Sequence, residues 1–351
     1  MIQDIETPAV LIDLDIVEAN IAAAQRRFDA MGVKFRPHIK THKIPQLARM
    51  QLREGAQGIA CQKLSEAEVF AADGFGDILL CFNLLSPAKI RRLRALAAGC
   101  TLTVVADNLE TIGALSQGFA DRDQPLSVLV ECDTGMGRCG VQTPEAAAAL
   151  AQAISQAPGL HFQGLMTYPA VAGEARVEAF MSASRALCIA ETGHCATISS
   201  GGTPTMADAA LCPSVTEYRA GTYIYNDRSL VARGSCDWAD CALTVLATVV
   251  SRPTPDRAIL DAGSKSLTSD LLGLQGYGHL VEFPDATINA LSEEHGIVRL
   301  NPHAPGPAIG QQVQIIPNHA CPVSNLVDRV YFHRSGTLIG PQDVTARGCV
   351  V

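Results

Sequence analysis

A lysine flanked by other polar side chains follows a short apolar segment near the start of the chain. Residues 35–43 read FRPHIKTHK, so Lys40 stands where a buried strand would end. A lysine held at the end of a strand is a candidate nucleophile for Schiff-base chemistry with a carbonyl group. The alternative is a solvated basic loop, and this stretch alone leaves both interpretations open.

A glycine-rich segment is suited to binding an anion. Residues 199–205 read SSGGTPT and lie between a predicted strand and a predicted helix. Glycines let backbone N–H groups approach a phosphate, and a helix N-terminus adds a favourable dipole. The alternative is an ordinary Gly-Pro turn. The residues of the predicted cradle are Ser200, Gly201, Gly202 and Thr203, with Gly221 and Thr222 from a later segment.

Two further clusters could bind an oxygen or a metal. Residues 133–140 read DTGMGRCG, and Arg138 in this loop could bind a phenolate or carboxylate oxygen. The alternative is a capped turn held by an Asp133–Arg138 pair. His319 and Cys321 are two positions apart, so in a strand both side chains would face the same side and could ligate a metal such as Zn²⁺. The alternative is a buried histidine beside a buried cysteine, and His295 is a further candidate near a metal.

Eight short apolar segments alternate with segments long enough to form helices. The apolar segments are residues 34–39, 58–62, 77–82, 102–106, 127–132, 161–167, 197–200 and 217–220. Continuous apolar runs are typical of parallel strands that are covered on both faces. Eight strand–helix units over about 200 residues predict a (β/α)8 barrel, whose reactive side chains lie at the carboxyl ends of the strands. Lys40, Arg138 and Tyr168 follow the first, fifth and sixth segments, and Arg219 lies at the eighth.

The residue composition of the chain changes near residue 230. Residues 241–250 and 257–261 are rich in β-formers, and turn residues become frequent. The predicted fold class is α/β, with an N-terminal (β/α)8 barrel over residues 13–230 and a C-terminal mainly β domain over residues 231–351. Residues 1–12 are predicted to add a strand to the β domain.

Composition excludes several classes of protein. The 351 residues are 48% hydrophobic with a net charge of -8, which argues against a nucleic-acid binder because such proteins usually present a basic face. Acidic residues within the first 20, among them Asp4, Glu6, Asp13 and Asp15, predict that no signal peptide is present, and no apolar run approaches the roughly 18 residues of a membrane span. The twelve cysteines form no CxxC pair, so we expect reduced thiols and a cytoplasmic protein.

Several segments resemble, in order along the chain, those of one known family. They are residues 36–43, 133–141, 164–168, 260–265, 292–296 and 318–322. The chain is similar to the D-threonine aldolase and D-serine dehydratase family of pyridoxal-phosphate (PLP) enzymes, which have the alanine-racemase fold type. The resemblance runs over nearly the whole chain. It implies a barrel that carries the cofactor, a β domain that carries a divalent metal, and a homodimer with active sites between subunits.

The resemblance also implies residue roles. Lys40 matches the Schiff-base lysine, Arg138 the arginine beside the ring oxygen, and Tyr168 a tyrosine that lines the cofactor. Gly201, Gly202, Thr203, Gly221 and Thr222 match the phosphate cradle. Arg219 stands where alanine racemases have an arginine at the pyridine nitrogen. His319 and Cys321 match the metal pair, for which Zn²⁺ or Mn²⁺ is expected, with Mg²⁺ or Co²⁺ also able to support activity.

The implied function is a PLP- and metal-dependent lyase that acts on small D-3-hydroxy amino acids. The first interpretation is retro-aldol cleavage to glycine and an aldehyde. Dehydration of D-serine or D-3-hydroxyaspartate is an alternative, because the His-x-Cys pair resembles that of the dehydratases and residues 169–173 lack the histidine expected as an aldolase base. An amino-acid racemase with Tyr277 as second base and a non-enzymatic PLP carrier are further alternatives. The substrate side chain stays open.

Overall fold

The computed structural model describes residues 2–351 and divides them into two compact units. The barrel unit comprises residues 24–40, 45–221 and 349–351. Its strands are β2 (Lys34–Phe35), β3 (Ile59–Cys61), β4 (Asp77–Leu80), β5 (Thr101–Ala106), β6 (Leu126–Cys132), β7 (Leu160–Thr167), β8 (Thr197–Ser200) and β9 (Glu217–Tyr218). Each of the eight apolar segments thus contains or overlaps one strand, and the predicted fold class is confirmed.

The eight strands form one parallel sheet in the order β2-β9-β8-β7-β6-β5-β4-β3. A parallel bridge between His38 and Ala60 brings the chain after β2 against β3, so the two ends of the sheet meet. Five side chains from successive strands fill the interior, and they are Ala60, Leu79, Val105, Leu129 and Met166. Because all strands run the same way, the loops that follow them gather at one edge, here called the carboxyl edge.

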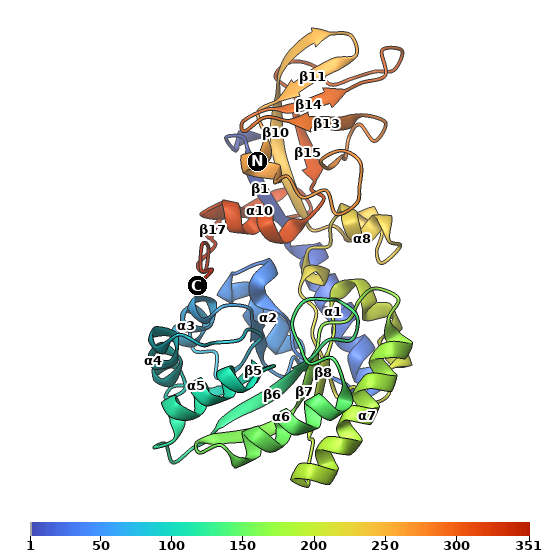
Figure 1. The fold of residues 1–351 in the computed structure, drawn as a ribbon. Coiled ribbons are helices and arrows are strands. Elements are labelled where there is room, and N and C mark those ends of the chain that lie inside the picture. Colours follow the sequence, from blue (N-terminus) through green and yellow to red (C-terminus); the bar gives the residue numbers. More distant parts are fainter. Residues whose placement is uncertain (1) are drawn as a thin grey trace. The chain divides into compact units, whose positions relative to one another are not determined.

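Helices connect the strands, and Figure 1 shows α4 to α7 on the outer side of this sheet. They are α2 (Pro45–Glu54), α3 (Leu64–Ala72), α4 (Pro87–Leu96), α5 (Leu109–Phe119), α6 (Pro144–Gln156) and α7 (Glu174–Thr192), with the 3-10 helix η3 (Thr203–Leu211). The side chains of Ser86, Asn108 and Thr143 cap α4, α5 and α6 by accepting a backbone N–H of the first turn. These caps fix where each helix begins, and therefore how long each loop at the carboxyl edge is.

The β unit comprises residues 2–23, 41–44 and 222–348. Its strands are β1 (Ala9–Asp13), β10 (Leu243–Thr254), β11 (Arg257–Leu260), β12 (His279–Leu280), β13 (Thr287–Leu291), β14 (Gly296–Arg299), β15 (Gln312–Ile316), β16 (Arg329–Arg334) and β17 (Thr337–Asp343). β1 lies between β10, which is antiparallel to it, and β16, which is parallel to it. The chain therefore changes unit after residues 23, 40, 44, 221 and 348.

The remaining helices of the chain are short except for one. They are η1 (Ile2–Asp4), α1 (Leu14–Met31), η2 (Ile39–Thr41), η4 (Thr222–Ile224), α8 (Arg228–Ala232), η5 (Trp238–Asp240), α9 (Ser264–Leu267) and α10 (Ala320–Leu326). Within residues 2–351, no helix has both the length and the apolar character needed to cross a membrane.

Candidate active site

Lys40 is held at the carboxyl edge by the backbone that precedes it. The N–H of His38 donates to the carbonyl of Ala220 at 2.8 Å, and His38 also forms the bridge to Ala60. The 3-10 turn η2 then carries Lys40, whose own N–H lies 3.4 Å from Nδ1 of His38. The side chain is half-buried. A half-buried amine on a backbone fixed from two sides can hold a covalently bound carbonyl compound in one place.

The loop after β6 presents Arg138 to the ring of Tyr168. Oδ1 of Asp133 accepts the N–H groups of Gly135 at 2.9 Å and Gly137 at 3.1 Å, which folds the loop back on itself. Burial raises the pKa of the Asp133 carboxyl, but these hydrogen bonds outweigh it and keep the pKa below its ordinary value. The guanidinium carbon of Arg138 lies 5.0 Å from the centre of the Tyr168 ring. This cation–π pair joins the loops that follow β6 and β7.

The two glycines after β8 are required by close contacts. Gly201 has φ +131°, and a Cβ there would lie 2.7 Å from the backbone nitrogen of Arg219. A Cβ at Gly202 would lie 3.1 Å from the Tyr168 ring. The hydroxyl of Tyr218 donates to the carbonyl of Gly202 at 3.1 Å and supports the loop from inside. The glycine backbone therefore lies directly against the ring and arginine that flank it.

The backbone of this cradle fits an anion. Within residues 2–351, the N–H groups of Gly201, Gly202 and Gly221 donate to no protein acceptor. Ser200, at the end of β8, and Thr203, at the start of η3, are buried beside them. Unpaired N–H groups beside a helix start are the arrangement that binds phosphate in other proteins.

Arg219 follows β9 and is 4% exposed. Its Nη1 donates to Oγ of Ser199 at 2.6 Å, and its Nη2 donates to the carbonyl of Thr167 at 2.8 Å. No acceptor for its Nε lies within residues 2–351. A guanidinium held this way keeps a free donor for a ring nitrogen. Together, Lys40, the Arg138–Tyr168 pair, the glycine cradle and Arg219 fit a phosphorylated aromatic aldehyde such as PLP.

His319 and Cys321 lie at a helix N-terminus, so the prediction that they share a strand is wrong. His319 caps α10 with extended backbone angles, and Cys321 lies in the first turn. Their side chains nevertheless lie close enough for Cys321 to raise the pKa of His319 against the effect of burial. The Cys321 sulfur lies 3.2 Å from Oγ1 of Thr41 and 3.5 Å from Oγ1 of Thr222. Thr222, which the sequence assigned to the phosphate cradle, belongs to the β unit. Its hydroxyl there contacts Cys321.

Two carboxylates that sequence reasoning missed support this pair. Oδ2 of Asp270 lies 2.8 Å from Nδ1 of His319. Oδ2 of Asp227 accepts the N–H of Ala320 at 3.0 Å, and its Oδ1 accepts from Ser229 at 2.6 Å. Burial opposes the charge on His319, but Cys321 and Asp270 raise its pKa to about 9. An imidazole oriented by a carboxylate, next to a thiol, is a donor set that suits Zn²⁺.

Glu131 is a third acidic residue whose environment the sequence did not reveal. It is the second-last residue of β6, near the carboxyl edge, and is 5% exposed, and no group within residues 2–351 donates a hydrogen bond to its carboxylate. Burial and the nearby charge of Asp107 raise its pKa to about 7, although Arg138 and Arg219 act in the opposite direction. Glu131, Asp107 and Cys139 place possible ligand atoms within 4.8 Å of one another.

Two further residues weighed in the sequence are His295 and Tyr277. His295 is exposed in the turn between β13 and β14. Tyr277 lies before β12, where its N–H donates to the carbonyl of Ile288.

Two protein-family models match successive parts of the chain. The model of the "Alanine racemase, N-terminal domain" matches residues 12–229, and that of the "Putative serine dehydratase domain" matches residues 242–333. The fold and site thus define a protein of the alanine-racemase fold type that carries a dehydratase-like β domain. The chain belongs to the D-threonine aldolase and D-serine dehydratase-like family, whose members are lyases. This membership implies PLP as the cofactor.

Individual relatives cover nearly the whole chain. A D-threonine aldolase of Arthrobacter is 37% identical over 98% of this chain and 93% of its own. The crystal structure of D-threonine aldolase from Filomicrobium marinum has a TM-score of 0.90 at 32% identity, covering 99% of this chain and 98% of that one. A D-threo-3-hydroxyaspartate dehydratase of Delftia strain HT23 is 32% identical over 90% of this chain and 91% of its own. Solved forms of a dehydratase of that name include a histidine-to-alanine mutant and a cysteine-to-alanine mutant, the latter described as metal-free.

Proposed function

We propose that this chain cleaves D-3-hydroxy amino acids to glycine and an aldehyde, using PLP on Lys40 and a divalent metal at His319 and Cys321. The observation that carries the proposal is the presence of two donor sets in one chain. One is the PLP-shaped edge of the barrel, and the other is the His–Cys pair of the β unit. The similarity to two D-threonine aldolases over nearly the full length supports the retro-aldol reaction in particular.

The barrel residues would each bind one part of the cofactor. The amino group of Lys40 would hold the aldehyde, and the N–H groups of Gly201, Gly202 and Gly221 would bind the phosphate. Arg138 would face the ring oxygen, with Tyr168 stacked beside it, and Arg219 would face the ring nitrogen. PLP supplies an electron sink for the bond that breaks at Cα of an amino acid. Orienting that bond is then the task of these side chains.

The β unit would bind the metal through Nε2 of His319 and the sulfur of Cys321. A metal ion there would supply a Lewis acid for the hydroxyl group of a substrate. Asp270 would keep Nδ1 of His319 protonated, so that Nε2 keeps its lone pair. A thiolate ligand favours Zn²⁺, whereas Mn²⁺, Co²⁺ and Mg²⁺ prefer sites with more oxygen or nitrogen ligands.

Dehydration is the second candidate, and one observation favours it. The histidine and cysteine mutated in the solved dehydratase are two positions apart, which is the spacing of His319 and Cys321. In dehydration, Lys40 would act as the base that removes the proton from Cα. In retro-aldol cleavage, a base must take the proton of the β-hydroxyl, and residues 169–173 offer no histidine for that role.

A product assay decides between the two reactions. Purified protein with PLP and either Zn²⁺ or Mn²⁺ is given D-threonine, D-serine and D-3-hydroxyaspartate, each with and without EDTA. Glycine plus an aldehyde is the expected result. Ammonia plus a keto acid would overturn retro-aldol cleavage in favour of dehydration. If the reaction proceeds equally well with EDTA, His319 and Cys321 take no part in it, and a racemase is favoured. The stereochemistry of the recovered amino acid would reveal racemase activity.

The cofactor assignment has its own test in a pair of lysine variants. Lys40→Ala should lose the visible absorbance of covalently bound PLP, while Lys34→Ala, an exposed lysine at the start of β2, should keep it. A parallel pair tests the metal. His319→Ala should lose bound Zn²⁺, and His303→Ala, an exposed histidine in a loop of the same unit, should retain it. An unchanged spectrum in Lys40→Ala would remove Lys40 from cofactor binding.

We infer that the active form is a homodimer in a reducing compartment, as in the cytoplasm. Three large apolar side chains are exposed after strands of the barrel unit, namely Met136 after β6, Val171 after β7 and Leu211 at the end of η3. Exposed apolar side chains that gather on one face are typical of a protein interface, and we infer that these three contribute to one. All twelve cysteines are free thiols, which suits a reducing compartment. Light scattering on the purified protein tests the dimer, and Leu211→Glu should shift it towards monomer.

A further inference from the structure

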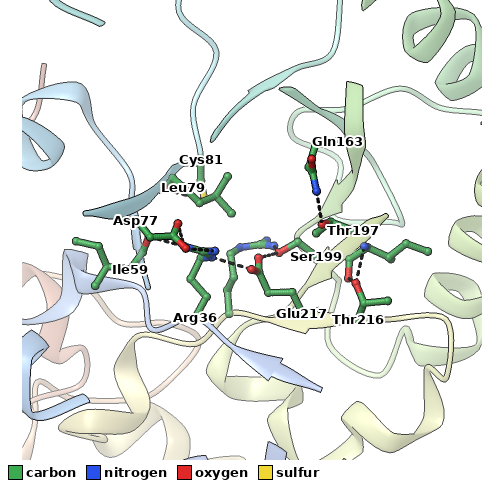
Figure 2. Close-up of polar contacts among 12 residues, drawn as sticks. Arg36, Ile59, Asp77, Leu79, Cys81, Gln163, Thr197, Ser199, Thr216 and Glu217 are labelled. Atoms are coloured by element: carbon green, nitrogen blue, oxygen red, sulfur yellow. Dashed lines mark hydrogen bonds and ion pairs between the residues drawn. The ribbon is translucent and has the colours of Figure 1, made fainter. Parts of the chain in front are cut away.

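A continuous line of hydrogen bonds crosses the interior of the barrel unit. Nη1 of Arg219 donates to Oγ of Ser199, and that hydroxyl donates to Oε1 of Glu217, each at 2.6 Å. Nε of Arg36 donates to Oε2 of Glu217 at 2.7 Å, and Nη1 of Arg36 donates to Oδ1 of Asp77 at 2.7 Å. Figure 2 shows Arg36 between Asp77 and Glu217. These five side chains are here called the barrel network.

The network spans the depth of the barrel. Arg219 stands after β9 at the carboxyl edge, beside the glycine cradle. Asp77 is the first residue of β4, so it lies at the opposite end of the sheet. There it lines a cavity of about 290 Å³ together with Arg36 and Glu217. Hydrogen bonds therefore connect the end of the barrel that holds this cavity with the carboxyl edge.

Stability does not account for this network. Barrel interiors are usually filled by branched apolar side chains, and strands β3 to β7 follow that pattern here. Ser199 is fully buried and Glu217 is 5% exposed, and buried ion pairs rarely stabilise a fold more than apolar packing would. What a fully paired buried network does provide is a fixed geometry. Burial opposes the charge of Arg36, yet Glu217 and Asp77 keep its pKa above the ordinary value.

The direction of each hydrogen bond shows how that geometry reaches Arg219. The hydroxyl of Ser199 has a single proton, and the ionised carboxylate of Glu217 can only accept it. The lone pairs of Ser199 are thereby left to accept from Arg219. Arg36 fixes Glu217 from the other side. With Nη2 of Arg219 bound to the backbone of Thr167, both terminal nitrogens of that guanidinium are held.

We propose that the barrel network holds the guanidinium of Arg219 in place for the cofactor ring, with Ser199 and Glu217 as positioning residues. The inference rests on the proposed function, since it takes Arg219 to contact PLP. The inference goes beyond the proposed function because Ser199 and Glu217 would act only through Arg219. Both lie in the barrel interior and would not contact the cofactor.

The test is a double-mutant cycle on the affinity of the apoprotein for PLP. Ser199→Ala removes the acceptor of Nη1, and we expect PLP binding to weaken about tenfold, as for the loss of a hydrogen bond to a charged group. Ser199→Thr keeps the hydroxyl and should keep most of the affinity. Ser127→Ala, a serine of β6 that lines the basal cavity without touching Arg219, is the matched control and should bind PLP as the parent does.

Repeating the Ser199→Ala substitution in the Arg219→Ala variant separates a positioning role of Ser199 from a general loss of structure. In that background Ser199→Ala should cause no further loss, because its effect passes through the missing guanidinium. The pH dependence of the visible spectrum should also shift in Ser199→Ala, since the ring nitrogen loses a fixed donor. An equal loss in both backgrounds, or an unchanged affinity and spectrum in Ser199→Ala, would overturn the proposal.

Three remaining outcomes are also decisive. If Ser199→Ala does not fold, Glu217→Gln makes the same comparison, and failure of both variants to fold would assign the network to folding and overturn the proposal. If Lys40→Ala abolishes PLP binding while Arg219→Ala leaves it unchanged, the proposed function stands and the positioning role falls. If neither variant changes PLP binding, the proposed function itself fails.

Discussion

The carboxylate of Asp270 lies 2.8 Å from Nδ1 of His319, the imidazole nitrogen that faces away from Nε2. The two residues are 49 positions apart in the chain. A carboxylate on one nitrogen of a histidine fixes the tautomer and makes the other nitrogen a better metal ligand. Asp270 thus orients His319 before any metal arrives.

Removing this carboxylate should weaken metal binding without removing a ligand. For Asp270→Ala we expect a loss of about 10- to 100-fold in Zn²⁺ affinity, as for other partners of metal-bound histidines. Competition titration with a chromophoric chelator measures it. Asp285→Ala, which truncates an exposed aspartate in the turn before β13, is the control and should bind Zn²⁺ normally. Equal affinities in the two variants would show that Asp270 has no such role.

The glycine cradle should not accept a methyl group at Gly202. A Cβ there would lie 3.1 Å from the Tyr168 ring, so either the ring or the loop must move. We expect Gly202→Ala to weaken PLP binding roughly tenfold or more. Gly76→Ala is the matched control, because a Cβ at Gly76 meets no atom within 4 Å. Fluorescence titration of the apoproteins with PLP gives both constants, and parent-like binding by Gly202→Ala would contradict the assignment of the cradle.

The environment of Glu131 makes apoprotein stability depend on pH. Burial and Asp107 raise its pKa to about 7 from an ordinary value of 4.5. The unfolded chain therefore loses this proton first as pH rises, and stability falls between about pH 4.5 and pH 7, by at most about 3 kcal/mol. Glu131→Gln has no carboxyl to ionise at this position, so it should not show this fall in stability with rising pH. It should unfold at a higher temperature than the parent at pH 8, and the difference should shrink towards pH 5.

Calorimetry at several pH values checks this difference. Glu145→Gln, an exposed carboxyl in the first turn of α6, should follow the parent at every pH. A Glu131→Gln variant that unfolds earlier than the parent at pH 8 would mean that the ionised carboxylate is stabilised by its surroundings.

The apolar half of the barrel interior should be sensitive to truncation. Leu129 is 1% exposed and packs in the interior cluster, so Leu129→Ala should cost about 2–5 kcal/mol of unfolding free energy. Leu109→Ala removes the same atoms from a side chain that is 62% exposed and should cost less than about 0.5 kcal/mol. Denaturant unfolding of both apoproteins gives the comparison. Similar small losses in both would show that the interior can collapse around the gap.

The barrel could be predicted from the sequence because its signal is local and repeated. Each parallel strand is buried on both faces, so it appears as a short continuous apolar run, as at residues 126–132. The loops at the carboxyl edge also carry local signals, since glycines such as Gly201 are needed wherever the backbone must approach a neighbour closely. Lys40 could be singled out because a polar cluster ends an apolar run.

The local structure at the metal pair was predicted wrongly for a physical reason. A spacing of two positions suggested a strand, but Pro322 is the third residue of α10, and proline is tolerated in the first turn of a helix. The His–Cys pair meets there because the cap residue and the first turn lie close together. Asp270 gave no local signal, since its role depends on His319, which is 49 positions away in the chain.

The order of the chain through the two units limits how the molecule can be divided. β1 comes from the N-terminus, yet it forms hydrogen bonds on both sides, to β10 and to β16. At the other end, Val351 belongs to the barrel unit, where its carbonyl accepts from the backbone and hydroxyl of Ser65. Residues 231–351 expressed alone would lack β1 and expose the facing edges of β10 and β16, which are templates for aggregation. Separate production of residues 1–230 and 231–351 is therefore expected to give insoluble material from either fragment.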